Sequence, residues 1–209
     1  MIPVNVLAVR YLANASPALA KGLGAPAGMP SLGLLTTDCD DATYIALDAA
    51  TKAADVQVSY GRSFYAGAAN ASTPNAGEVI GILAAATPGA VRSGMEAALS
   101  ALERLGFEET HGVPFLAHTV ASVGSFLAKE AGVSMGSAIA YLIAPPLEGM
   151  YAMDAALKAA DVKLCKLYAP PSETNFGGGL LSGTQSACQA ACSAFAAAVA
   201  EVAKQPLEK

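Results

Sequence analysis

The chain carries the same sequence pattern twice, once in each half. Residues 46–58 (ALDAATKAADVQV) return as residues 152–164 (AMDAALKAADVKL), with nine of thirteen positions identical at a shift of 106 residues. Earlier in each half, LAKGLG at 19–24 matches LAKEAG at 127–132, at a shift of 108 residues. Two matches in the same order at nearly the same spacing indicate an internal duplication. A duplication of this size predicts two tandem domains and excludes a solenoid of many small repeats.

We predict domains at residues 1–108 and 109–209, with the boundary in a polar stretch that Gly106 and Gly112 flank. Both halves have the pattern β-α-β-α-β-β-α, which predicts an α+β fold in which each domain is a β-sheet with packed helices. The first short helix has Ser16 as its expected N-cap and Pro17 at its first position. The expected strands are residues 4–12, 32–36, 56–60 and 79–83, then 115–123, 138–143, 162–168 and 180–182.

The remaining helices are expected from apolar periodicity. One helix covers residues 44–54 and its repeat covers the corresponding residues of the second half, and a longer helix closes each half. The apolar stripes of the closing helices are Val91, Met95, Ala98, Leu102 and Leu105 in the first half, and Cys188, Cys192, Phe195, Val199 and Val202 in the second.

The composition favours self-association. Hydrophobic residues make up 54% of the chain and charged residues 14%, against a usual charged share of about 25%. A domain of about 100 residues cannot bury that much apolar surface internally, so further copies are the expected cover. No membrane span is expected, because the longest stretch without charged residues, 174–200, contains three consecutive glycines and two glutamines. Arg10 interrupts the apolar N-terminus, so no secretory signal is expected either.

No cofactor, metal site or catalytic constellation is expected. The net charge of −5 lacks the basic stripe that a nucleic-acid partner requires. His111 falls in the presumed linker and His118 on an apolar strand, and neither lies in a nucleophile or metal motif. Cys188 and Cys192 are four residues apart, so they either present two thiolates to one metal or continue the apolar stripe, and core packing is the favoured interpretation.

The acidic residues Asp38, Asp40 and Asp41 follow the expected strand at 32–36. One interpretation is that they cap the helix that follows, where the helix dipole favours negative charge. The second half has Ala144-Pro145-Pro146-Leu147-Glu148 at this place. The asymmetry favours a ligand-binding role in the first half.

Two long, small-residue-rich loops occupy corresponding places, at residues 61–77 and 170–179. They carry little charge, and their glycines permit several backbone conformations. Loops of this length in compact domains are usually functional or disordered. Equivalent loops from several subunits that meet at a symmetry axis would line a pore.

Several strings of this sequence resemble one family. SLGLLTTDCDDATYIALDAATKAA, YGRSFYAGAANASTPNAGEV and AYLIAPPLEGMYAMDAALKAADV are similar to bacterial microcompartment shell proteins, and specifically to the tandem-domain type from ethanolamine-utilising compartments. The resemblance covers nearly the whole chain. It implies two circularly permuted shell domains and a flat homotrimer that mimics a hexamer. Such trimers tile with hexameric shell proteins in the cytoplasm, and they are structural proteins rather than enzymes.

The resemblance also implies two kinds of pore for metabolites such as ethanolamine. A small acidic pore within each subunit is expected at Asp40, Asp41, Glu78 and Phe107. A gated central pore is expected from loop residues Ser63, Phe64, Tyr65, Ala66, Gly67, Asn175, Phe176, Gly177, Gly178 and Gly179. Lys52 and Lys158, repeated in both halves, are expected at the edge where tiles meet. A duplicated regulatory protein that binds small molecules is the alternative function.

Overall fold

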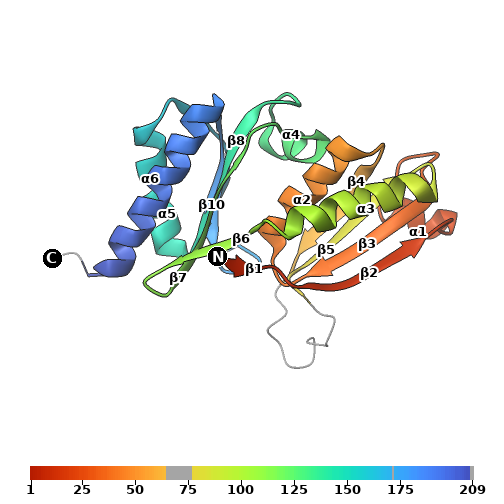
Figure 1. Ribbon diagram of the computed structural model, residues 1–209, viewed down its shortest axis with the longest axis horizontal. Coiled ribbons are helices and arrows are strands. Elements are labelled where there is room, and N and C mark those ends of the chain that lie inside the picture. The colour runs from red at the N-terminus through yellow and green to blue at the C-terminus, as the bar shows by residue number, and fades with distance from the viewer. Residues whose placement is uncertain (65–76, 171, 208–209) are drawn as a thin grey trace. The chain divides into compact units, whose positions relative to one another are not determined.

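The computed structural model describes residues 1–64, 77–170 and 172–207, and it divides into two compact units (Figure 1). Unit 1 comprises Met1–Ile2, Gly106–Val123 and Ala128–Lys209. Unit 2 comprises Pro3–Leu105 and Gly124–Leu127. Both units combine a β-sheet with packed helices, which confirms the predicted α+β fold class.

Unit 2 is built on a four-stranded antiparallel sheet in the order β2-β3-β5-β4. The central strand β5 is almost entirely buried, because α2 and α3 cover one face of the sheet and a small apolar cluster packs on the other. On one face, α2 and α3 pack against each other, and Leu47 of α2 occupies the space above Gly81 of β5. On the other face, Leu23 at the end of α1 joins a small apolar cluster with Leu32 and Ile82. The elements are β2 (Val6–Leu12), α1 (Pro17–Gly22), β3 (Ser31–Thr37), α2 (Asp40–Ala53), β4 (Gln57–Ser63), β5 (Val79–Ala85) and α3 (Pro88–Leu102).

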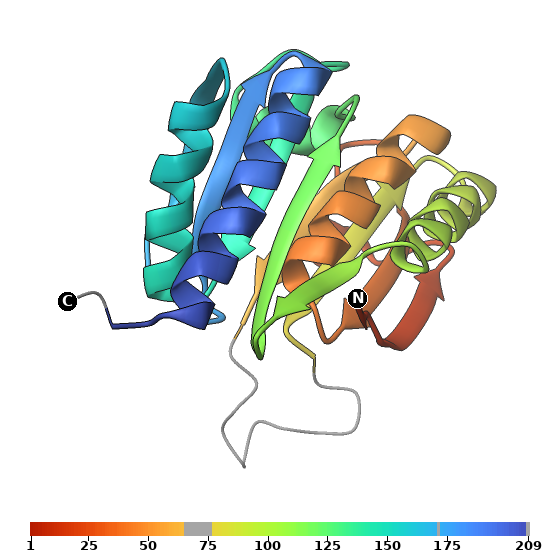
Figure 2. The ribbon, with the colours of Figure 1, turned by 60° about the vertical axis from the view of Figure 1, so that its left-hand side comes forward.

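Unit 1 contains a six-stranded sheet in the order β1-β6-β7-β8-β10-β9. Helices α5 and α6 lie side by side along this sheet (Figure 2). The core between them includes Phe195, Cys188 and Cys192, so the apolar stripe predicted for the last helix is confirmed as far as Val199, whereas Val202 is only partly buried. The elements are β1 (Ile2–Pro3), β6 (Gly106–Thr110), β7 (Val113–Val120), α4 (Ser125–Ala131), β8 (Ala138–Ala144), α5 (Pro146–Ala159), β9 (Val162–Tyr168), β10 (Gly177–Gly183) and α6 (Gln185–Lys204).

Helix α6 is long and apolar enough, by length and composition alone, to cross a membrane. Six of its residues are nevertheless buried in the folded unit, among them Phe195 and Val199. The stripe that they form packs against α5 and strands β7 and β8. Its apolar character is therefore accounted for by the core of unit 1.

The backbone repeats along with the sequence. Both 14-residue helices, α2 and α5, begin and end at positions 106 residues apart. Gly24 and Gly132 share positive φ angles of 70° and 63°, and Gly28 and Gly136 share φ angles of 83° and 84°. Left-handed backbone of this kind favours glycine, so the duplicated turns explain why these four glycines stand where they do.

The polar stretch predicted as a linker is instead a hairpin. Residues 106–110 form β6, which pairs with β7 through Glu108↔Phe115 and Thr110↔Val113. The turn between them places His111 at φ 49° and Gly112 at φ 80°. The prediction of a linker was wrong because Glu108, Glu109 and Thr110 give this short strand a polar sequence without the apolar alternation that predicts a strand.

Candidate functional site

One end of the unit 2 sheet gathers four acidic residues. Asp38 follows β3, Asp40 and Asp41 begin α2, and Glu78 precedes β5. The sheet register brings these segments together, because Thr37 of β3 and Ser63 of β4 both pair with Val79 of β5. The backbone N–H of Glu78 also donates to the carbonyl of Thr37 at 2.9 Å.

A hydroxyl network holds the turn from β3 into α2. The Oγ1 of Thr37 accepts from the backbone N–H of Cys39 at 3.1 Å and lies 2.7 Å from Oγ1 of Thr43. Thr43 in turn donates to the carbonyl of Cys39 at 2.8 Å. Cys39 is the N-cap of α2 but makes no side-chain capping bond, and Asp40 instead accepts from a first-turn N–H, that of Asp41, at 2.9 Å. Asp40 and Asp41 lie in its first turn, where the helix dipole stabilises negative charge.

Burial sets the electrostatics of this cluster. Asp40 and Asp41 are each 7% exposed. Burial raises the pKa of Asp40, although hydrogen bonds from Ser63 and from the backbone N–H of Asp41 at 2.9 Å partly oppose the shift. Burial, with the charges of Asp40 and Asp38, also raises the pKa of Glu78. Burial thus disfavours the ionised form of these carboxyl groups, and a bound small cation that donates hydrogen bonds would stabilise that ionised form.

Asp38 has a different role from its neighbours. Its carboxylate accepts from the backbone N–H of Asn5 at 2.8 Å and from the side-chain amide of Asn5 at 2.7 Å. These bonds tie the segment before β2 to the end of β3. Asp38 is therefore a structural residue of unit 2.

Sequence reasoning missed the side chains that position the acids. The Tyr44 hydroxyl lies 2.6 Å from Oγ of Ser63, and Ser63 hydrogen-bonds Asp40. Ser63 was predicted only as a central-pore residue. The remaining predicted small-pore residue, Phe107, belongs to unit 1, where its ring contacts the ring of Phe176 with centroids 5.6 Å apart.

The predicted central-pore residues fall into four groups. Phe64 lies at the end of β4, where its N–H donates to the carbonyl of Glu78 at 2.9 Å. Tyr65, Ala66 and Gly67 lie outside the described residues. Asn175, with φ 65°, precedes Phe176, whose N–H donates to Oγ of Ser172 at 3.1 Å.

The fourth group, Gly177, Gly178 and Gly179, was predicted as a flexible loop, and this was wrong. These glycines are buried in β10, paired with Ala144, Ile143 and Leu142 of β8. A Cβ at Gly178 would overlap the carbonyl of Leu142, so the glycines serve close strand packing.

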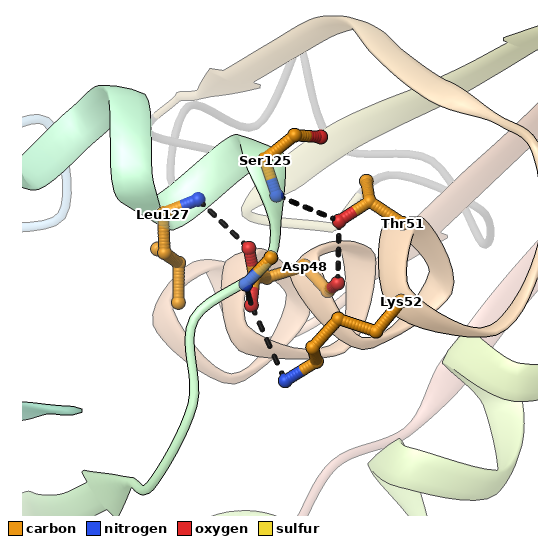
Figure 3. A network of polar contacts seen from close by, with 6 residues as sticks. Asp48, Thr51, Lys52, Ser125 and Leu127 are labelled. Carbon is orange, nitrogen blue, oxygen red and sulfur yellow. Dashed lines mark hydrogen bonds and ion pairs between the residues drawn. The ribbon is translucent and has the colours of Figure 1, made fainter. Parts of the chain in front are cut away.

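A second polar network centres on Asp48 of α2, which is fully buried (Figure 3). Its two carboxylate oxygens accept from the backbone N–H groups of Gly124 at 2.7 Å and Leu127 at 2.9 Å. Thr51, one turn later, accepts from the N–H of Ser125 at 3.1 Å. The short helix α4 begins at Ser125, and the residue before it, Gly124, has no side chain with which to cap it. Asp48 therefore caps a helix start that lies 76 residues away in the sequence.

The two repeated lysines differ in their surroundings. Lys52 lies 3.4 Å from the buried carboxylate of Asp48, whereas Lys158 lies 2.6 Å from Asp154 in a pair whose side chains are 74% and 63% exposed. The prediction of an i,i+4 pair is confirmed in both halves. Only the first pair belongs to a buried network.

Two of the four cysteines lie in the core of unit 1. Cys188 and Cys192 are buried members of the unit 1 core, which confirms the packing interpretation. Burial raises the pKa of Cys192 to about 11, so its thiol stays protonated at neutral pH. Among residues 1–64, 77–170 and 172–207, no group of three or more His, Cys, Asp or Glu side chains is placed to hold a metal ion.

Comparisons with known proteins identify relatives over the full chain. The model of the BMC domain matches residues 31–115. The chain is 57% identical to the bacterial microcompartment shell protein EutL of Clostridium perfringens, over 99% of this chain and 97% of that protein. It is 46% identical to the protein of the same name from Escherichia coli, over 100% of this chain and 97% of that protein. The crystal structure of the ethanolamine utilization protein EutL from Leptotrichia buccalis superposes with a TM-score of 0.95 at 56% identity, covering 100% of this chain and 98% of that one.

Proposed function

The chain belongs to the EutL family of bacterial microcompartment shell proteins, and from this premise we propose that three copies form a flat, pseudohexameric tile with pores for small metabolites. The chain is a structural protein of the microcompartment shell in the bacterial cytoplasm, and it is not an enzyme. Its two domains, at residues 1–108 and 109–209, supply six shell domains in a trimer. Such a tile meets hexameric shell proteins edge to edge.

The proposed trimer is supported by the duplication and by apolar exposure. Two repeats of one fold, placed three times around an axis, give six similar positions. Leu19, Leu147 and Tyr151 expose 46%, 64% and 46% of their surface, although the chain has a well-packed core in each unit. Large apolar side chains exposed in this number indicate a surface that other copies cover.

The acidic cluster is the proposed small pore for ethanolamine. Asp40, Asp41 and Glu78 meet at one end of the unit 2 sheet, and burial, together with the charges of Asp40 and Asp38, raises the pKa of Glu78. An ethanolammonium ion combines one positive charge with four hydrogen-bond donors, which suits buried carboxylates. Affinity in the millimolar range, about −4 kcal/mol, suits a conduit because a tight site would block flow. Phe107 stays a proposed member of this site.

The proposed central pore uses loop residues rather than the buried glycines. Ser63 and Phe64 lead out of β4, and Asn175 and Phe176 lead into β10. Because Gly177 already belongs to β10, any change of the gate on this side is confined to the turn before it. Tyr65, Ala66 and Gly67 complete the proposal from outside the described residues.

Lys52 and Lys158 are the proposed contacts at the tile edge. Lysine is retained at both positions, although the neighbouring residue of the repeat changed from Thr51 to Leu157. Both side chains are partly or largely exposed, at 38% and 74%. A long aliphatic stem with a charged end suits a contact between the flat edges of two tiles.

Assembly is tested by electron microscopy of negatively stained protein at high concentration, together with native mass spectrometry at micromolar concentration. We expect a trimer and extended two-dimensional arrays. A discrete oligomer that forms no arrays would instead support a duplicated regulatory protein, and a monomer would remove the basis for the tile.

The small pore is tested by soaking crystals of the wild type and of Asp40→Asn with Glu78→Gln in equal concentrations of ethanolamine. We expect lower ethanolamine occupancy in the double variant. Asp154→Asn, which removes an exposed carboxylate in unit 1, is the matched control and should leave occupancy unchanged. Equal occupancy in all three crystals would show that these carboxylates are not the site.

A further inference from the structure

Two hydroxyl groups connect α2 and β4 to the acidic cluster. The hydroxyl of Tyr44 lies 2.6 Å from Oγ of Ser63, the last residue of β4, and Ser63 in turn hydrogen-bonds the carboxylate of Asp40. Tyr44 and Asp40 are four residues apart on α2, so they lie on the same face of this helix. We call Tyr44 and Ser63 the hydroxyl relay.

The chemistry of these groups fixes the direction of the two hydrogen bonds. A serine hydroxyl has one hydrogen to donate and two lone pairs with which to accept, whereas an ionised carboxylate only accepts. The hydrogen of Ser63 is therefore donated to Asp40, and the hydrogen between Ser63 and Tyr44 comes from Tyr44. Both hydroxyls of the relay consequently donate toward the carboxylate.

Packing holds the Tyr44 ring independently of its hydroxyl. The ring centroid lies 5.8 Å from that of Phe126, which belongs to the segment 124–127 that Asp48 binds. A Cβ at Gly61 of β4 would lie 3.3 Å from Cε1 of Tyr44 and 3.7 Å from Cζ of Phe126, so this glycine leaves space for both rings. Removal of the Tyr44 hydroxyl alone should therefore leave the ring in place.

The surroundings of Asp40 show what the relay contributes. The titratable groups of the site are Cys39 and Asp41 beside Asp40, Asp38 after β3 and Glu78 before β5. Arg62 of β4 lies with its guanidinium carbon 5.8 Å from the centroid of the Tyr60 ring. Burial raises the pKa of Asp40, whereas the hydrogen bonds from Ser63 and from first-turn N–H groups oppose this shift. Hydrogen-bond donors thus favour the ionised carboxylate here.

The second repeat has the same helix without the relay. At a shift of 106 residues, Met150 stands in place of Tyr44, and Pro146 in place of Asp40. Helix α5 nevertheless has the length of α2 and begins at the corresponding residue. The fold of the repeat therefore does not require a hydroxyl at this position, which favours a role for Tyr44 in the acidic site.

We propose that Tyr44 is a positioning residue of the acidic site and acts through Ser63 to hold the Asp40 carboxylate ionised and oriented for a primary ammonium ligand. This proposal rests on the proposed small pore for ethanolamine, to which it adds a residue that acts through another side chain. An ammonium group gains most from an ionised acceptor, because the hydrogen bond is then charge-assisted.

Calorimetry of ethanolamine binding to the full chain tests the proposal. We expect the Kd at neutral pH to rise about threefold to tenfold in Tyr44→Phe and about tenfold or more in Ser63→Ala. Ser63→Thr retains a hydroxyl and should bind as the wild type does. Tyr11→Phe is the matched control: Tyr11 pairs with Gly33 toward the other end of the sheet, and loss of its hydroxyl should leave the Kd unchanged.

The pH profile distinguishes a positioning role from a purely structural one. Ethanolamine binds the ionised carboxylate, so binding weakens as the pH falls through the pKa of Asp40. The bond from Ser63 lowers this pKa, and loss of the relay should therefore raise it. In Tyr44→Phe and Ser63→Ala, binding should consequently begin to weaken at a higher pH than in the wild type. A variant that only loosens the fold would lose affinity equally across the pH range.

The ionisation of Asp40 is also measurable without ligand, by ¹³C NMR of the full chain labelled at the aspartate carboxyl carbons. Asp40→Asn assigns the signal. We expect the Asp40 carboxyl to titrate at a higher pH in Tyr44→Phe than in the wild type. An unchanged titration would overturn the proposal, as would a Ser63→Thr variant that binds ethanolamine as weakly as Ser63→Ala.

The outcomes separate this proposal from the proposed function. If the wild type binds no ethanolamine, the small pore is refuted, and the NMR titration alone decides whether the relay keeps Asp40 ionised. If the wild type binds ethanolamine but Tyr44→Phe changes neither the affinity nor the titration of Asp40, the small pore stands and the role of Tyr44 is refuted.

Discussion

Replacing Asp48 by alanine should destabilise the fold far more than replacing Asp154, although the two residues occupy the same place in the repeat. The Asp48→Ala variant loses two charge-assisted hydrogen bonds of 2.7 and 2.9 Å to the backbone of Gly124 and Leu127. It also leaves those two N–H groups, and the ammonium of Lys52, without this carboxylate.

The expected magnitude follows from burial. Breaking a buried ionic interaction by removing one partner costs about 3–5 kcal/mol. The two lost bonds, at about 1.5–3 kcal/mol each for a charged acceptor, give a similar range. The Asp154→Ala variant loses only an exposed i,i+4 pair with Lys158, which contributes about 0.2–0.5 kcal/mol. For a chain of this length, the difference corresponds to a fall in Tm of about 6–20 °C for Asp48→Ala alone.

The assay is equilibrium unfolding in urea at one fixed protomer concentration, because association stabilises the folded chain by mass action. Asp48→Asn is the informative third variant. It keeps the side-chain volume but turns an amide NH₂ group toward one of the two N–H donors, so it should remain clearly destabilised. If Asp48→Ala and Asp154→Ala differ by less than about 1 kcal/mol, the reasoning that Asp48 is a buried helix cap fails.

Three further outcomes follow from the structure. Because the pKa values of Asp40 and Glu78 are raised, these carboxyls become protonated at a higher pH than ordinary carboxyls do. The ammonium group of ethanolamine keeps its charge over the same pH range. Calorimetry should therefore show that ethanolamine binding weakens as the pH falls. A pH-independent affinity would refute this. Gly178→Ala should destabilise the protein by more than about 1 kcal/mol in urea unfolding, since its φ of 157° and close packing in β10 leave no room for a Cβ. An unchanged unfolding midpoint would show that Gly178 does not lie in a closely packed strand. Lys158→Asp should abolish two-dimensional arrays while leaving the trimer intact, as judged by microscopy and native mass spectrometry, and arrays as extensive as those of the wild type would exclude an edge role. Lys52→Asp is the less informative variant, because it places a second carboxylate beside a buried one and so perturbs the fold as well.

The fold was predictable because its signals are local and occur twice. Turn glycines such as Gly24 and Gly132, the Ser16 cap and the apolar stripe through Phe195 each specify an element without reference to distant residues. The errors arose where a local pattern has two explanations. Consecutive glycines at 177–179 suggested a flexible loop, but they are required by the close approach of β8. That approach depends on tertiary packing, which a local sequence pattern does not show.

The acidic cluster was only partly predictable, for the same physical reason. Asp40 and Asp41 stand out in the sequence because the second repeat lacks them, and Glu78 came from the family resemblance. Ser63 and Tyr44 gave no such signal, since their bond to each other depends on the packing of α2 against β4. Two features of the sequence indicate the Asp48 network. An aspartate is retained in both repeats, and a glycine stands at the start of α4 where the first repeat has Ser16.

The helix cap that Asp48 supplies across the repeat also bears on how this chain evolved. In a ring of identical single domains, every junction is built from one set of residues, so a mutation changes all junctions at once. Duplication separates the junction within a chain from the junction between chains, and each then accumulates its own substitutions. Here Asp48 caps the helix start at Gly124 from a buried position, while Asp154 at the corresponding place in the second repeat pairs with Lys158 in an exposed position. The same freedom allows the Asp40–Asp41 pair to exist in one repeat and Pro146–Leu147 in the other, so the chain carries this acidic pair once rather than twice.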